Sequence, residues 1–132
     1  MKRFGLSKNE RIRSHKDIQK IYSFGKTFSS SDKKLKATFF IQQEQPEGGV
    51  KLMAAVSKKS GNAVWRNRIK RLIRESFRMN KKELTEKCIE KKIRLFIVFS
   101  ALSINIKENK KVRLKEISPP VIELMTAISR SF

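Results

Sequence analysis

The chain has 132 residues, and its 32 Lys and Arg against 12 Asp and Glu give a formal net charge of +20. This length fits one domain, residues 1–132, with its own hydrophobic core, and the single Cys88 excludes an internal disulfide or a cysteine-cluster metal site. No apolar run approaches the roughly 18 residues of a membrane span, and residues 1–14 lack the apolar segment of a signal peptide, so we expect a soluble, cytoplasmic protein with no membrane partner.

The first predicted element is a short helix over residues 15–24, where apolar side chains recur at helical spacing. Ser14 precedes this segment and is a suitable N-cap, and Gly25 follows it as a stop signal. Residues 27–34 contain three consecutive serines and predict a polar loop.

Two strands are predicted after this loop. Residues 35–42 are rich in β-branched and aromatic side chains, and residues 50–56 are also predicted to be extended. Between them, residues 45–49 hold one Pro and two Gly, which is a turn signal. We therefore expect the two strands to pair as a hairpin with a longer loop.

The strongest helix of the sequence is predicted at residues 62–79, with Asn62 as its N-cap. A charged segment that favours a helix follows at residues 81–92. Residues 93–99 are apolar enough to predict a strand that is buried on both faces.

The C-terminal region is harder to assign. Residues 112–117 alternate like a strand but are equally compatible with a helix. Ser118 and Pro119 then predict the start of a terminal helix, because Pro is tolerated in the first turn. The apolar side of this helix is predicted to carry Val121, Ile122, Leu124, Met125 and Ile128. The order α-β-β-α-β-α predicts an α+β fold in which helices pack on one sheet.

The excess of positive charge points to a polyanionic partner. Uncompensated charges repel one another in a compact protein, and binding to phosphates relieves that repulsion. A membrane-binding protein would concentrate its charge on one amphipathic helix or tail. Here residues 1–20 hold seven Lys and Arg against two acidic residues, and residues 58–78 hold eight against Glu75 alone. This spread favours nucleic acid over a membrane surface.

The predicted helix at residues 62–79 has two contrasting sides. Positions four apart stack on one face of a helix. One stripe is apolar and consists of Trp65, Ile69, Ile73 and Phe77, widened by Leu72. The other is cationic and consists of Arg66, Lys70, Arg74 and Arg78, widened by Asn67 and Arg71. We therefore expect the first stripe to join the core and the second to face solvent.

The cationic stripe is suited to phosphate. Like charges four residues apart destabilise a helix, so a helix face that only contacts water would normally carry both positive and negative side chains. Arginine, which dominates here, forms paired hydrogen bonds with phosphate oxygens. Because no second helix stands at helix-turn-helix spacing and zinc ligands are lacking, the hairpin before the helix favours an RNA-binding domain over a DNA-binding one.

Residues 57–78 closely resemble the signature of the protein subunit of bacterial ribonuclease P. The centre of that signature is the triplet Arg66-Asn67-Arg68, followed by Lys70-Arg71 and Arg74-Glu75. The order of the other elements also agrees, up to about residue 100. Residues 100–120 depart from the family pattern and are longer, so no role is assigned to them.

The resemblance implies a function as one part of a ribonucleoprotein. In that family a large RNA subunit, with Mg²⁺, hydrolyses the phosphodiester bond that releases the 5′ leader of precursor tRNA. The protein binds this RNA and the leader, which implies ribonuclease P RNA and precursor tRNA as partners, with no obligate protein partner. Because no carboxylate pair or His cluster appears in the sequence, no catalytic residue and no metal site are assigned to the chain, and Mg²⁺ is expected to be held mainly by the RNA. The fold implied is an α/β sandwich with a left-handed β-α-β crossover.

The same resemblance assigns residues to two sites. The residues expected to bind RNA are Lys58, Lys59, Asn62, Arg66, Asn67, Arg68, Lys70, Arg71 and Arg74. A cleft between the first helix and the sheet is implied to hold the single-stranded leader, and the residues expected to line it are Ile18, Tyr22, Phe39 and Ile41. Tyr22 keeps an aromatic ring on which a base can stack, whereas Ile18 replaces a frequent aromatic.

Two other functions remain open from the sequence. One is a ribosomal or other structural RNA-binding protein with a similar basic helix, and the other is a nuclease that acts without RNA. For Tyr22 and Phe39, a place in the core is as compatible with the sequence as a place in the cleft. Trp65 and the Phe residues at 77, 96 and 99 are expected in the core.

Overall fold

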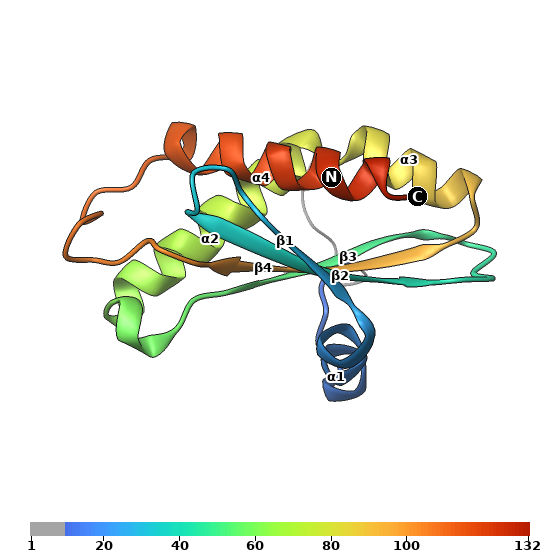
Figure 1. The fold of residues 1–132 in the computed structure, drawn as a ribbon, viewed down its shortest axis with the longest axis horizontal. Coiled ribbons are helices and arrows are strands. Elements are labelled where there is room, and N and C mark those ends of the chain that lie inside the picture. Colours follow the sequence, from blue (N-terminus) through green and yellow to red (C-terminus); the bar gives the residue numbers. More distant parts are fainter. Residues whose placement is uncertain (1–9) are drawn as a thin grey trace, which may run out of the picture.

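Among residues 10–132, a four-stranded sheet has one α-helix on its first face and three α-helices on its second face (Figure 1). The computed structural model describes residues 10–132. In chain order the elements are α1 (His15–Phe24), β1 (Lys26–Ser29), β2 (Leu35–Gln42), β3 (Gly49–Ala55), the short 3-10 helix η2 (Lys58–Ser60), α2 (Ala63–Asn80), α3 (Lys82–Glu90), β4 (Arg94–Ala101) and α4 (Leu114–Arg130). The α+β fold class predicted from the sequence is confirmed.

The strand order β1-β2-β4-β3 contradicts the predicted hairpin. β4 lies between β2 and β3, antiparallel to the first and parallel to the second. Residues 95–99 of β4 are all buried, and a strand that is apolar on both faces is most stable at the centre of a sheet. Parallel neighbours require a crossover connection, which α2 and α3 supply between β3 and β4. The left-handed sense of this crossover stays an expectation from the resemblance.

The predicted polar loop at residues 27–34 is partly wrong, because Lys26–Ser29 forms β1 at the edge of the sheet. Its Thr27 hydroxyl lies 3.1 Å from that of Thr38 on β2, and Phe28 packs with its ring centroid 5.2 Å from that of Phe39. A short, polar strand is typical of a sheet edge, where few side chains are buried. The serine-rich segment then turns the chain into β2.

The terminal helix begins earlier than Ser118. α4 starts at Leu114, so Pro119 and Pro120 lie inside it rather than in its first turn. The buried stripe extends back to Ile117, one turn before Val121, and this burial holds the first turn in helical form. Of the five residues predicted for its apolar side, four are buried, but Ile122 is 41% exposed and lies outside the core.

The two faces of the sheet belong to two hydrophobic clusters. The larger contains Leu35, Ala37 and Phe39 of β2 and the apolar side chains of α2, α3 and α4. The smaller lies under α1 and contains Ile12, Ile21, Phe96 and Val98, with Ile18, Phe40, Met53 and Ala55 packed around it. The expected core positions of Trp65, Phe77, Phe96 and Phe99 are confirmed.

α1 approaches the sheet closely at Gly25. Ser14 caps the start of the helix, as predicted, and Gly25 ends it by donating its N–H to the carbonyl of Ile21. A Cβ atom at Gly25 would lie 2.3 Å from that carbonyl oxygen and 2.6 Å from the backbone oxygen of Phe39. Both obstacles are backbone atoms, which cannot move aside as a flexible side chain would.

We therefore expect Gly25→Ala to lower the free energy of unfolding by about 1–3 kcal/mol, the usual range for a packing clash. Urea unfolding followed by circular dichroism measures this loss. Ser23→Ala, an exposed change in the same helix, is the control and should stay within about 0.5 kcal/mol of the parent. Equal stability of the two variants would show that α1 is free to move off the sheet.

Candidate nucleic-acid interface

α2 is amphipathic in the way the sequence predicts. Its apolar stripe is buried against the sheet and α4, whereas its cationic side chains lie on the exposed or half-buried outer surface. Asn62 is the N-cap, and its side-chain oxygen accepts a hydrogen bond of 2.9 Å from the N–H of Trp65. Packing and capping together fix the rotation of the helix, so its cationic side faces solvent.

The segment before α2 adds two further cations. Lys58 and Lys59 are exposed on η2, whose turn is closed by the Ser57 and Ser60 hydroxyls 3.0 Å apart. Arg66 folds back toward this turn and donates from Nε to the carbonyl of Gly61 at 3.1 Å. That bond orients the guanidinium and leaves its Nη groups without a partner among residues 10–132.

Arg68 has a contact that the sequence did not reveal. Its Nε and Nη2 atoms donate to the carbonyl of Val112 at 3.1 and 2.7 Å, 44 positions along the chain. The indole N–H of Trp65 donates to the carbonyl of Asn109 at 2.9 Å. The first turns of α2 therefore hold the loop before α4. Two of the donor atoms of Arg68, Nε and Nη2, are used in this structural contact.

Arg74 lies in a group of three guanidinium side chains. Burial, together with the charges of Arg11 and Arg71, lowers the pKa of the Arg74 guanidinium below its ordinary value. Arg11 comes from the segment before α1, which forms a β-bridge with Leu52 of β3. The sequence did not single out Arg11, because only this pairing brings it near α2. A group of like charges of this kind is stabilised by an anion such as phosphate.

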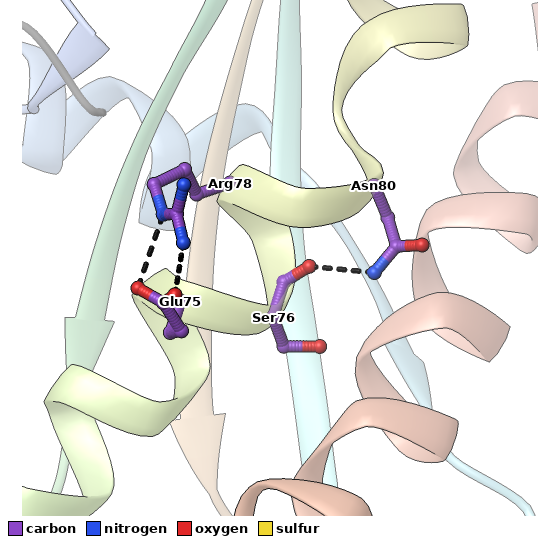
Figure 2. Close-up of polar contacts among 4 residues, drawn as sticks. All are labelled: Glu75, Ser76, Arg78 and Asn80. Carbon is purple, nitrogen blue, oxygen red and sulfur yellow. Dashed lines mark hydrogen bonds and ion pairs between the residues drawn. The ribbon is translucent and has the colours of Figure 1, made fainter. Parts of the chain in front are cut away.

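Arg78, at the end of the cationic stripe, is neutralised within the helix. Figure 2 shows its guanidinium paired with the carboxylate of Glu75, with Nε donating to Oε2 at 3.0 Å. This hydrogen bond lowers the pKa of the Glu75 carboxyl. In the following turn, the side-chain amide of Asn80 donates to the carbonyl of Ser76 at 2.8 Å and closes the helix (Figure 2). The uncompensated cations of α2 therefore lie on its first three turns, up to Arg74.

Two of the four residues predicted for the leader cleft lie on the wrong face of the sheet. Phe39 is only 3% exposed and Ile41 is half-buried, and both pack in the larger cluster, away from α1. Side chains alternate along a strand, so the residue of β2 that faces α1 is their neighbour Phe40. The error arose because the more apolar face of β2 was paired with the first helix, whereas that face is covered by α4.

The surface beside α1 still combines aromatic and cationic groups. Ile18 packs against the smaller cluster, and Tyr22 is 55% exposed one turn later on the same helix. Phe40 is half-buried, with its ring centroid 6.4 Å from that of Phe96. By alternation, Lys36, Lys51 and Arg94 project from this same face of the sheet. Alternation along β2 separates Phe40 from Phe39 and Ile41, but it does not show which of the two faces α1 covers.

Comparison with known proteins decides which family shares these features. The model of the family described as Ribonuclease P matches residues 6–117, most of the chain. The chain belongs to the ribonuclease P protein family. Among curated members, the ribonuclease P protein component of Clostridium novyi is 38% identical over 82 residues, which cover 62% of this chain and 70% of the relative. The ribonuclease P protein component of Porphyromonas gingivalis is 35% identical over 101 residues, which cover 76% of this chain and 72% of the relative.

Solved structures of ribonuclease P proteins share the fold. The Staphylococcus aureus protein superposes with a TM-score of 0.67 at 25% identity, covering 90% of this chain and 94% of that one. The Thermotoga maritima protein superposes with a TM-score of 0.65 at 23% identity, covering 89% of this chain and 96% of that one.

Neither a metal centre nor a membrane segment is found in the part of the chain that the structure describes. No group of three or more His, Cys, Asp or Glu among residues 10–132 is placed to hold a metal ion. No helix within the same residues is long and apolar enough to cross a membrane.

Proposed function

We propose that this protein binds the catalytic RNA of ribonuclease P through α2 and η2 and supports the Mg²⁺-dependent removal of the 5′ leader from precursor tRNA in the cytoplasm. The observation that carries the proposal is the orientation of α2, whose apolar stripe is buried while Arg66, Lys70, Arg71 and Arg74 line its outer side. Family membership supplies the class of RNA. The chemistry itself belongs to the RNA subunit, with the protein supplying contacts.

The charge of this surface supports binding to a folded RNA backbone. Guanidinium groups pair with phosphate oxygens, and each phosphate neutralised releases condensed counterions. The group formed by Arg11, Arg71 and Arg74 is unfavourable in the free protein because its charges repel one another. An RNA phosphate beside it would remove that repulsion, so binding and the stability of the protein should be coupled.

The α1 side of the sheet supports a second role in holding the leader. Single strands bind to grooves and faces that combine stacking rings with cations along the backbone. Tyr22 and Phe40 offer rings here, and Lys36, Lys51 and Arg94 offer charge on the same face. Phe39 and Ile41 have no part in this surface.

Reconstitution with the cognate ribonuclease P RNA tests the main proposal. At low Mg²⁺, leader cleavage should require the protein, and the protein freed of RNA should cleave nothing. No stimulation, together with tight binding to ribosomal RNA, would instead indicate a ribosomal or other structural RNA-binding protein. Cleavage that survives exhaustive removal of RNA would indicate a stand-alone nuclease.

A change at Tyr22 tests the leader surface. We expect Tyr22→Ala to weaken binding of leader-bearing precursor tRNA to the holoenzyme by about 5- to 150-fold, because base stacking contributes about 1–3 kcal/mol. Binding of mature tRNA, which lacks the leader, should be unchanged. The quantity to measure is the dissociation constant of each RNA under identical salt and metal conditions.

Phe24→Ala provides a matched control for Tyr22. Successive residues of a helix are about 100° apart, so Tyr22 and Phe24 lie on opposite flanks of the buried Ile21. Phe24 is 74% exposed and is an aromatic of the same helix, and its removal should leave precursor affinity near that of the parent. Equal losses for precursor and mature tRNA in the Tyr22 variant would remove this surface from the proposal.

A further inference from the structure

The loop at residues 102–113, which joins β4 to α4, lies against the start of α2 (Figure 1). Three hydrogen-bonding residues hold it there. Ser60 accepts from the N–H of Ile106 at 2.7 Å, Trp65 donates to Asn109, and Arg68 donates to Val112. All three belong to η2 or the first turns of α2, so the loop is attached to the part of the molecule that we propose binds RNA.

Apolar contacts also anchor the loop. Ile104 and Val112 are buried in the larger cluster, and Ile106 packs against it. The loop crosses so close to Gly61 that a Cβ atom there would lie 3.0 Å from the Cβ of Ile106. Inside the loop, Asn109 donates its N–H to the carbonyl of Asn105 at 2.8 Å, which closes a turn. The loop is therefore held in one conformation from both ends and from within.

The side chains that this loop exposes are mostly cations. Lys107, Lys110, Lys111 and Arg113 are exposed, against one acidic residue, Glu108. Within residues 10–132 none of the four cations forms an ion pair. The loop thus adds four exposed positive charges to a segment that contacts Ser60 of η2 and Arg68 of α2, in a protein that already carries a net charge of +20. Holding these four charges in a fixed loop on a cationic protein raises the electrostatic energy of the free protein, and a bound anion would lower it.

We propose that residues 102–113 form a second RNA-binding element that extends the cationic surface of α2 and contacts phosphates of the ribonuclease P RNA. This inference rests on the proposed function, since it adds to the same RNA interface. The loop belongs with η2 and α2, whereas the proposed leader surface is on the other face of the sheet beside α1 (Figure 1). The partner is therefore the catalytic RNA, and affinity for the leader should not depend on the loop.

The double variant Lys110→Gln/Lys111→Gln tests this proposal. Neither side chain has a structural contact that the substitution would remove, so the melting temperature should not fall. If both lysines contact phosphate, the slope of log affinity against log salt for ribonuclease P RNA should become shallower by about 1.4–1.8, at about 0.7–0.9 per contact. At a salt concentration where binding of the RNA limits the reaction, the loop variant should also stimulate cleavage less than the parent protein does.

Lys82→Gln/Lys92→Gln is the control of equal charge. Both lysines are exposed, and they stand at the far ends of α2 and β4 from the loop, about 25 Å away by the length of these elements. If the salt slope of this control changes as much as that of the loop variant, only net charge matters and the proposal is wrong. An unchanged slope in a folded loop variant would also overturn it.

Site-directed crosslinking gives an independent measurement. Burial raises the pKa of the Cys88 thiol to about 11, so a cysteine introduced by Lys110→Cys can be labelled selectively with a photoactivated crosslinker. In the assembled holoenzyme with precursor tRNA, we expect crosslinks to the ribonuclease P RNA. Crosslinks to the leader alone, or to no RNA in a complex that still cleaves, would contradict the proposal. If the parent protein neither binds nor activates the RNA, the proposed function itself fails.

Discussion

Replacing Lys70, Arg71 and Arg74 together with Gln is expected to reduce the affinity for ribonuclease P RNA more than any other surface change in the protein. All three lie on the outer side of α2, and none donates a hydrogen bond within residues 10–132. The slope of log affinity against log salt should become shallower by about 2.1–2.7, at about 0.7–0.9 for each lost phosphate contact. Filter binding or fluorescence anisotropy at several salt concentrations measures it.

The stability of the free triple variant separates binding from folding. Arg74 and Arg71 belong to the group of like charges that includes Arg11, so their removal should leave the free energy of unfolding unchanged or raise it by roughly a few tenths of a kcal/mol per pair. A control that removes three charges from the α3 region, Lys82→Gln/Lys91→Gln/Lys92→Gln, should change the slope little. Equal slopes for the two triple variants would show that α2 does not provide the specific contact surface.

Phe77→Ala is expected to be the most destabilising single change described here, at about 3–5 kcal/mol. Phe77 is fully buried on the inner side of α2, with its ring centroid 6.2 Å from that of Phe99 on β4. Removing the ring leaves a cavity where the helix meets the sheet, and domains of this kind are stable by only about 5–15 kcal/mol in total. Urea unfolding followed by circular dichroism measures the loss.

Met79→Ala is the matched control, because Met79 is 59% exposed two residues later in the same helix. The free energy of unfolding of this control variant should stay within about 0.5 kcal/mol of that of the parent. Because RNA binds the folded state, saturating ribonuclease P RNA should recover part of the melting temperature lost by Phe77→Ala. A loss below about 1 kcal/mol in that variant would mean that α2 is not anchored to the sheet as described.

The helix that carries the proposed function was predictable from the sequence, and so were its two sides. Its period of 3.6 residues separates the stripe of Trp65, Ile69 and Phe77 from the cations, and Asn62 marks its start. These are local properties, set by neighbours along one helix. The same is true of β4, whose continuous apolar run predicted burial on both faces.

The order of strands and the contacts between distant segments were decided only by the tertiary structure. β4 enters between β2 and β3, and this placement, rather than any local pattern, prevents the predicted hairpin. The choice between Phe39 and Phe40 beside α1 depends on which face of the sheet each helix covers, and alternation along one strand does not determine that.

The proposed RNA interface shows the same division. Its cations on α2 and η2 follow from the sequence, but the bond from Arg68 to Val112 joins residues 44 positions apart, and Arg11 reaches the neighbourhood of Arg74 through its pairing with β3. Periodicity reports how a segment divides between core and solvent. Which segments then become neighbours depends on the joint burial of all the apolar faces, and that is a property of the whole fold.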